Sequence, residues 1–105
     1  MDTAAMQANA QEASALLKSL ANPSRLLVLC ALVNREHTAG ELEQLTGLSQ
    51  PAISQHLARL REAQIVATRR EAQRIFYSLC NKEVRTVLET LYEIYCPDES
   101  DIEML

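Results

Sequence analysis

The sequence predicts a mostly α-helical fold with one β-hairpin, built as a single domain over residues 1–105. Three observations support this prediction. Apolar residues recur at helical spacing in about five segments. Gly47 separates the third of these segments from the fourth by a turn of only a few residues. Two runs rich in β-branched and aromatic residues then follow each other closely, as the strands of a hairpin do.

The first three helices each carry a local signal. Apolar residues at helical spacing place the first helix over about residues 5–20. Asn22 followed by Pro23 starts the second helix, because an Asn side chain caps an N-terminus and proline fits the first helical position. Thr38, with Glu41 three residues later, is typical of a capping box and opens a third, short helix.

A helix-turn-helix is predicted in the middle of the chain. Gly47 ends the third helix, since glycine readily adopts the left-handed conformation of a C-cap. Ser49 can cap a fourth helix over residues 50–62. The apolar stripe of that helix consists of Ile53, Leu57 and Leu60. A short turn between two such helices is the signature of this supersecondary unit.

The segment after this unit predicts a wing. Residues 65–69 and 74–79 are strand-like and flank a polar turn at residues 70–73. Asn81 can cap a last helix, and the acidic tail at residues 97–105 is expected to be loose. The complete prediction is a winged helix-turn-helix with about five helices and a two-stranded wing.

The charge distribution favours a nucleic-acid partner, although the net charge is −4. Residues 1–48 carry three basic and five acidic side chains, and residues 75–105 carry two and seven. Residues 49–74 carry five arginines against two glutamates, a balance of +3. DNA affinity depends on the local field that faces the phosphates, so this basic window outweighs the acidic total.

The expected location is the cytoplasm. The N-terminal residues lack the basic start and apolar run of a signal peptide, and no segment approaches the roughly 20 apolar residues that span a bilayer. Cys30, Cys80 and Cys96 do not form the even-numbered framework of a secreted miniprotein. In a reducing compartment they are expected to be free thiols unless a signal oxidises them.

The predicted DNA contacts lie on the outer face of the fourth helix and on the hairpin. Base reading in the major groove needs short hydrogen-bonding side chains that let the backbone approach. On the helix the candidates are Ser49, Gln50, Ser54, Gln55, His56 and Arg59. On the hairpin they are Arg69, Arg70 and Arg74, which would bind phosphate or enter the minor groove. His56 lies about 60° from the centre of the apolar stripe, so packing or a phosphate contact explains it as well as base reading.

Two motifs resemble the ArsR/SmtB family of dimeric winged-helix repressors. They are Leu16-Leu17-Lys18-Ser19-Leu20-Ala21-Asn22-Pro23-Ser24-Arg25-Leu26 and Leu48-Ser49-Gln50-Pro51-Ala52-Ile53-Ser54-Gln55-His56-Leu57. The resemblance covers about residues 10–96. It implies a homodimer through the first and last helices, and a palindromic double-stranded DNA operator whose affinity an inducer changes.

The metal-binding patterns of that family are missing here. One pattern places a Cys-x-Cys pair in or just before the DNA-reading unit, whereas Cys30 stands alone. Another uses Asp and His on the final helix, which has no histidine. His37 and His56 lie on different predicted elements, so a tetrahedral N/S site is hard to assemble. We therefore expect no metal and no cofactor. No nucleophile–base pair or phosphate loop suggests an enzyme.

Four further segments resemble the sulfide-responsive branch of the family, which includes the BigR, SqrR and YgaV repressors and the HlyU regulators. The segments are residues 25–30, 40–44, 73–77 and 91–96. The resemblance implies a sensor made of two cysteines, one on the second helix and one at the end of the last. Cys30 and Cys96 match those positions, and Cys80 has no counterpart. Simple packing would also explain Cys30, because free cysteine is often buried.

These observations leave four hypotheses for the function of the protein. The leading hypothesis is a repressor that releases its operator when reactive sulfur species bridge Cys30 and Cys96. The second is a regulator that is redox-insensitive or activating. A metal sensor is disfavoured by the missing ligands. A winged helix used purely for protein–protein contact belongs to another class, and a gel shift with genomic DNA separates it from the others.

Overall fold

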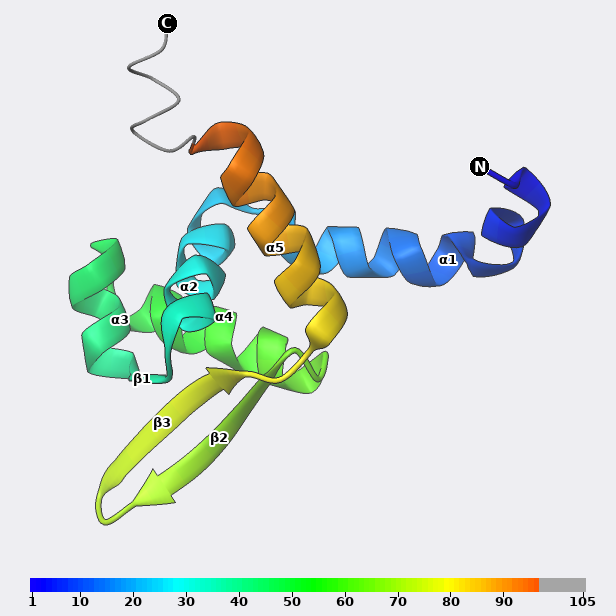
Figure 1. The fold of residues 1–105 in the computed structure, drawn as a ribbon. Coiled ribbons are helices and arrows are strands. Elements are labelled where there is room, and N and C mark those ends of the chain that lie inside the picture. The colour runs from blue at the N-terminus through cyan, green and yellow to red at the C-terminus, as the bar shows by residue number, and fades with distance from the viewer. Residues whose placement is uncertain (97–105) are drawn as a thin grey trace, which may run out of the picture.

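A computed structural model describes residues 1–96 and confirms the winged helix-turn-helix (Figure 1). The helices and strands follow one another as α1 (Thr3–Leu20), α2 (Pro23–Asn34), β1 (His37–Thr38), α3 (Ala39–Thr46), α4 (Gln50–Glu62), β2 (Val66–Glu71), β3 (Arg74–Leu79) and α5 (Lys82–Tyr95). Helices α3 and α4 form the helix-turn-helix. The three strands form one antiparallel sheet in the order β1-β3-β2, and β2 and β3 make the wing. The acidic tail lies outside the described residues.

The predicted caps begin and end the helices as expected. The Asn22 side chain accepts a hydrogen bond from the backbone of Arg25 at 2.9 Å. The capping box of α3 is complete, because Thr38 Oγ1 accepts from the Glu41 amide and the Glu41 carboxylate accepts from the Thr38 amide. Gly47 has a φ of 75°, the left-handed conformation that ends α3. The Asn22 and Thr38 side chains satisfy amides that a helix start otherwise leaves unpaired.

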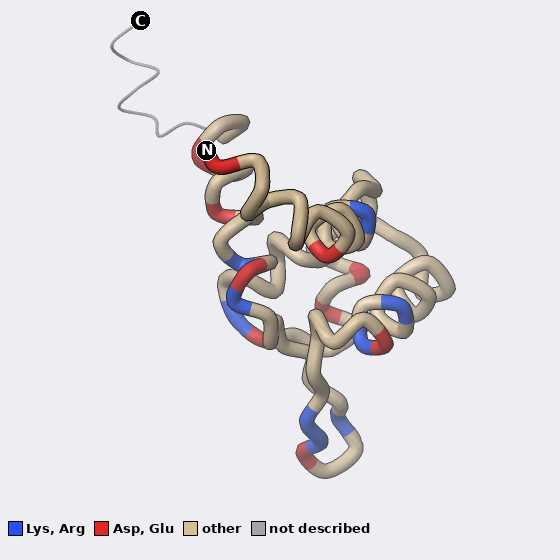
Figure 2. The backbone as a smooth tube through the Cα atoms, turned by 90° about the vertical axis from the view of Figure 1, so that its right-hand side faces the viewer, with Lys and Arg blue, Asp and Glu red and all other residues tan. Residues whose placement is uncertain are grey.

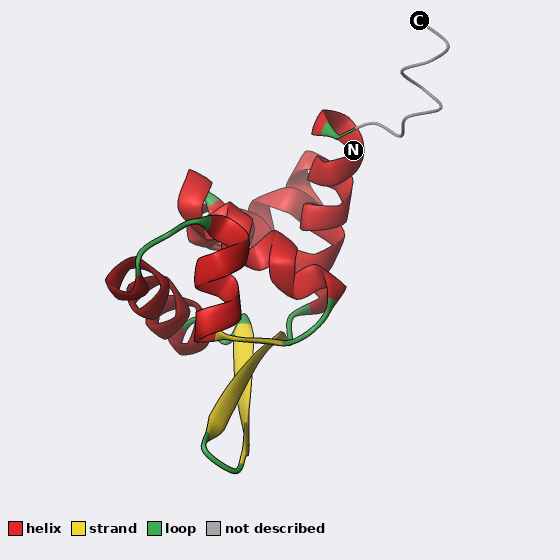
Figure 3. Ribbon diagram, turned by 90° about the vertical axis from the view of Figure 1, so that its left-hand side faces the viewer, coloured by secondary structure: helices red, strands yellow, loops and turns green. Residues whose placement is uncertain are grey.

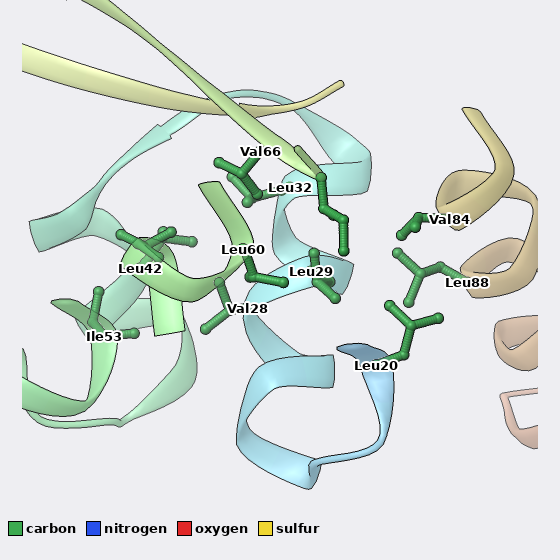
Figure 4. Close-up of a cluster of buried hydrophobic side chains, with 12 residues drawn as sticks. Leu20, Val28, Leu29, Leu32, Leu42, Ile53, Leu60, Val66, Val84 and Leu88 are labelled. Atoms are coloured by element: carbon green, nitrogen blue, oxygen red, sulfur yellow. The ribbon is translucent and has the colours of Figure 1, made fainter. Parts of the chain in front are cut away.

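A single apolar core holds the helices and the base of the sheet together (Figure 4). Helix α2 lies at its centre and contributes Val28, Leu29 and Leu32, each at most 2% exposed. The remaining members are Leu20, Leu42, Ile53, Leu57, Leu60, Ile65, Val66, Val84 and Leu88. The predicted stripe of α4 is entirely buried in this core, so the opposite face of α4 points outward.

The sheet differs from the prediction in two details. Strand β1 is a third strand that the sequence pattern did not reveal, because two residues are too few to show alternation. The hairpin turn contains only Ala72 and Gln73, and Arg70 and Glu71 belong to β2. The turn needs a positive φ, here 56° at Ala72, and an alanine gives no sequence signal for that conformation. Figure 3 shows the wing projecting from the helical part of the molecule.

Helix α1 extends away from the core, and Leu20 is its only buried residue (Figure 1). Leu17 on α1 and Tyr92, Ile94 and Tyr95 on α5 are all more than half exposed. Their exposure is compatible with the dimer that the family resemblance implies, which stays a prediction. Among the described residues, no single helix is long and apolar enough to cross a membrane; α1 and α2 meet that test only as a pair bent by 93°.

The two glycines give a matched test of the cap at Gly47. Gly47→Ala meets no steric neighbour within 4 Å, so it should cost only the strain of a positive φ, about 1 kcal/mol of unfolding free energy. Gly40 lies in α3, and a Cβ added there would be 4.0 Å from its nearest neighbour, Thr38 Oγ1. Gly40→Ala should therefore stabilise the protein by about 0.5–1 kcal/mol, because alanine loses less conformational entropy in a helix than glycine. Urea denaturation of both variants checks the opposite signs. Equal effects would contradict the assignment of Gly47 as the cap.

Candidate nucleic-acid interface and thiol pair

The outer face of α4 presents the predicted base-reading side chains to solvent. Ser49, Gln50, Ser54, Gln55 and Arg59 are all exposed, opposite the buried stripe. Ser49 Oγ accepts a hydrogen bond from the Ala52 amide at 3.3 Å and so begins the helix. Gln50 Nε2 donates to Ser54 Oγ at 3.2 Å. The face therefore combines short donors and acceptors with one guanidinium, as major-groove contact requires.

His56 lies at the edge of this face and is half-buried. Its Nδ1 is buried and has no hydrogen-bond partner within residues 1–96. Burial, and then the positive charges of Arg25 and Arg59, lower the pKa of His56 below its ordinary value. The imidazole is therefore uncharged at neutral pH in the free protein, which favours the packing role over a phosphate contact.

The three wing arginines have different surroundings. Arg70 and Arg74 are exposed, and in the part of the chain that the structure describes neither has a carboxylate within ion-pair distance. The Arg74 guanidinium lies over the Phe76 ring, 4.9 Å from its centroid. Arg69 instead forms ion pairs with Glu36 and Glu71. Figure 2 shows basic residues on both strands of the wing, away from most of the acidic ones.

Cys30 faces the C-terminal half of α5, the end that Cys96 caps, whereas Cys80 lies before the other end of this helix. Cys30 lies on α2 and Cys96 caps the C-terminus of α5, and both are free and exposed. Exposure of Cys30 overturns the packing explanation within this chain. Cys80 precedes α5 at its other end, about 20 Å away along the helix, and its thiol donates to the Gln64 carbonyl.

The surroundings of Cys30 disfavour its thiolate form. Partial desolvation by neighbouring side chains, and then the negative charge of the Cys96 thiolate, raise the pKa of Cys30 above its ordinary value. Less of Cys30 is therefore thiolate at neutral pH than for a fully solvated cysteine. Since the thiolate is the nucleophile, Cys30 is the weaker candidate for the first attack on an electrophile.

A hollow of about 710 Å³ opens beside Cys30 between α2, α3 and α5. Its apolar lining includes Ala31, Leu45 and Tyr92, and Glu89 and Glu93 lie along it on α5. A volume of this size is typical of small-molecule sites. The Cys30 thiol is therefore open to a small reagent from this side.

Comparison with known proteins places the chain among bacterial regulators. Residues 22–68 match the model of the bacterial regulatory protein, arsR family. The chain is 48% identical to the HTH-type transcriptional regulator YgaV of Escherichia coli K12, over 91% of this chain and 98% of that protein. The chain belongs to the ArsR family. The family and this relative are transcriptional regulators, which confirms that predicted class of function.

Two further relatives of the ArsR-family chain carry names that describe their roles. The crystal structure of the transcriptional repressor BigR from Xylella fastidiosa superposes with a TM-score of 0.87 at 43% identity, covering 93% of this chain and 100% of that one. The transcriptional activator HlyU of Vibrio cholerae is 46% identical over 91% of this chain and 89% of that protein. The family includes both repressors and activators among proteins of similar sequence.

Within residues 1–96, no three His, Cys, Asp or Glu side chains are grouped so that they could hold a metal ion.

Two contacts in the structure were not predicted from the sequence. Glu36 was missed as a partner of Arg69, because the two are 33 residues apart and no local pattern joins them. His37 is buried, with its Nδ1 3.6 Å from a Glu41 carboxylate oxygen. The position of a lone histidine in a two-residue strand gives no sequence signal.

The electrostatic influence of Cys96 on Cys30 can be measured. In a Cys80→Ser background, Cys96→Ser should lower the midpoint of the pH profile for Cys30 alkylation, because it removes a negative charge that disfavours the Cys30 thiolate. Peptide mass spectrometry after iodoacetamide pulses at different pH gives the profile. Cys80→Ser alone should leave the midpoint unchanged. An unchanged midpoint in the Cys96→Ser variant would show that the two thiols do not interact.

Proposed function

We propose that this ArsR-family regulator is a homodimeric repressor that releases its operator when reactive sulfur species bridge Cys30 and Cys96. The observation that carries the proposal is that Cys30 lines the hollow beside α5, the helix that Cys96 caps. Burial and then the charge of Cys96 raise the pKa of Cys30, which agrees with this placement. The two cysteines belong to helices with different proposed roles, Cys30 to α2 and Cys96 to the end of α5. Helix α2 leads into the DNA-reading unit, and α5 carries exposed apolar residues suited to a partner subunit.

The DNA-binding part of the proposal uses α4 for bases and the wing for phosphates. Exposed Ser49, Gln50, Ser54 and Gln55 would read base edges in the major groove, and Arg59, Arg70 and Arg74 would add charge-assisted contacts. A dimer through α1 and α5 would present two α4 helices about a two-fold axis. Half-sites about one helical turn apart, roughly 34–36 Å, would then form a palindrome.

The switch chemistry needs one nucleophile and one resolving thiol. The Cys96 thiolate attacks the outer sulfur of a hydropersulfide R–S–SH, forms Cys96–S–SH and expels RS⁻. The Cys30 thiolate then attacks the inner sulfur of that persulfide, forms the Cys30–Cys96 disulfide and expels HS⁻. The two thiolates lose two electrons and the transferred sulfane sulfur gains them. If a second hydropersulfide first converts Cys96–S–SH to Cys96–S–S–SH and another RS⁻ is expelled, the Cys30 thiolate attacks the middle sulfur instead, expels HS⁻ and leaves a trisulfide.

The bridge would act on DNA binding through helix geometry. A disulfide holds its two Cα atoms about 4.4–6.8 Å apart, and an additional sulfur relaxes that limit. A bridge between α2 and the C-terminus of α5 would therefore couple the dimer interface to the spacing of the two α4 helices. Both half-sites must be met at once, so a small change in that spacing lowers affinity.

The similarity to HlyU favours a second candidate, a transcriptional activator with the same DNA contacts. Transcription in vitro from a promoter that carries the operator separates the two functions. A repressor lowers transcript yield when reduced protein is added, whereas an activator raises it. A protein that binds no DNA specifically would fit neither function and would indicate a protein-interaction module.

Base reading and phosphate binding should respond differently to mutation. Gln55→Ala should weaken operator binding by about 1–3 kcal/mol and change binding to scrambled DNA little, because it removes a base-edge contact. Arg70→Ala should weaken binding to operator and to scrambled DNA alike. It should also reduce the slope of the logarithm of the binding constant against the logarithm of the salt concentration (the salt slope) by about one, because it removes a phosphate contact. Fluorescence anisotropy over a salt series measures both quantities. Equal affinity of the unmutated protein for operator and scrambled DNA would refute sequence-specific binding.

The dithiol switch predicts which cysteines matter. Cys30→Ser and Cys96→Ser should each bind operator normally when reduced and should not release it on polysulfide treatment. Cys80→Ser is the matched control and should keep the full response, since Cys80 lies at the far end of α5. Gel shifts report release, and intact mass spectrometry reports the bridge and its number of sulfur atoms. Release of DNA by polysulfide from the Cys30→Ser or Cys96→Ser variant would exclude this mechanism.

A further inference from the structure

The guanidinium of Arg69 is bound by two carboxylates, those of Glu36 and Glu71, in the free protein. Its Nε lies 2.8 Å and 3.0 Å from the two carboxylate oxygens of Glu36, and Nη2 pairs with the same carboxylate. Its Nη1 donates to a Glu71 carboxylate oxygen at 3.0 Å. Its Cζ also lies 4.4 Å from the centroid of the Phe76 ring. Two carboxylates thus compensate its charge and use most of its donors.

The ion pair between Arg69 and Glu36 connects the wing to the rest of the protein. Glu36 precedes β1, in the segment that joins α2 to the sheet, whereas Arg69 lies on β2 at the opposite edge. Phe76 on the central strand β3 is the register partner of both Thr38 and Arg69. The Arg69 side chain therefore lies over Phe76 and ties the outer strand of the wing to the body. Glu71 is on β2 itself and cannot form such a tie.

The ion pair competes with a phosphate contact. The hydrogen bond from Arg69 is the main cause that lowers the pKa of Glu36, so this carboxylate is charged at neutral pH. A phosphate would have to displace a bidentate carboxylate whose geometry already matches the guanidinium fork. Arg70 and Arg74, which lack such partners among residues 1–96, need no such exchange.

We propose that Arg69 is a positioning residue that, paired with Glu36, fixes the angle of the wing so that Arg70 and Arg74 reach the phosphates. The proposal rests on the proposed contact between the wing and DNA. The two arginines are neighbours in sequence but have different roles in this proposal. Arg69 positions the wing, and Arg70 binds a phosphate of the DNA.

Glu36→Ala and Glu71→Ala test this inference as a matched pair. Each removes one carboxylate from the same guanidinium, but only Glu36→Ala unties the wing from the body. We expect Glu36→Ala to weaken operator binding by the reduced protein about two- to fivefold, the range of an exposed ion pair. Glu71→Ala should leave affinity unchanged or raise it, because a negative charge near the phosphates is lost. If Arg69 were a phosphate ligand, both variants would raise affinity.

The salt dependence gives a second readout that general loss of structure does not produce. Arg69→Ala should lower affinity with no change in the salt slope, whereas Arg70→Ala reduces the slope by about one. Arg69→Lys should behave like Arg69→Ala, since an ammonium cannot form the bidentate pair. The charge swap Glu36→Arg with Arg69→Glu should restore part of the lost affinity. A reduction of the slope by about one in Arg69→Ala would overturn the inference.

The outcomes distinguish this inference from the proposed function. If Arg70→Ala weakens binding and Glu36→Ala does not, the wing touches DNA and only the positioning role fails. If Arg70→Ala has no effect, the wing does not bind phosphate there, and both proposals for the wing fail. Circular dichroism and thermal unfolding of each variant confirm that the measured protein is folded. Hydrogen exchange should show faster exchange of β2 amides in Glu36→Ala than in Glu71→Ala.

Discussion

Burial of the apolar side of α2 determines where every functional group of this protein lies. Val28 and Leu29 are fully buried, and α4, α5 and the base of the sheet all pack around them (Figure 4). Truncating one such leucine would cost about 2–5 kcal/mol, a large part of the stability of a small domain. Because α4 buries its apolar stripe against α2, its polar face must point away from α2 into solvent. Cys30, the next residue after Leu29, is exposed on the outer side of α2.

The same packing connects α2 to α5, which is the condition for a thiol switch. Val84 and Leu88 fix α5 in the core, and Arg85 Nη1 donates to the Val33 carbonyl at the end of α2 at 3.0 Å. Helix α5 then passes beside the hollow that Cys30 lines, and Cys96 caps its C-terminus. Two thiols held by separate helices can report a covalent change as a change in helix arrangement. A pair within one helix could not do this.

An acidic protein can bind DNA here because its charges are separated in space. Arg69, Arg70 and Arg74 lie on the strands of the wing. Figure 2 shows the basic residues of the wing away from most of the acidic residues. The wing has little core of its own, since its outer half is exposed. Its direction therefore depends on a few contacts with the body of the protein. One of them is the ion pair in which the Arg69 guanidinium donates to both carboxylate oxygens of Glu36. A mobile basic hairpin would bind phosphate without a defined register.

The sequence by itself determined the elements whose causes are local. Asn22, Thr38 with Glu41, Gly47, Ser49 and Asn81 act within three or four residues, and each begins or ends a helix as predicted. The outward face of α4 also followed, because helical periodicity relates it to the buried stripe. The resemblance to known repressors added the family, and pointed to Cys30 and Cys96 as a pair.

Only the tertiary structure decided the contacts between distant segments. Strand β1 exists because β3 offers it a partner, and its two residues have no strand pattern of their own. Arg69 looked like its neighbours Arg70 and Arg74 until the fold placed Glu36, 33 residues earlier, against it. The raised pKa of Cys30 likewise depends on burial by neighbouring side chains and then on the charge of Cys96, which follows it by more than half the length of the chain. Local rules act over one helical turn, whereas these features depend on which surfaces the core brings together.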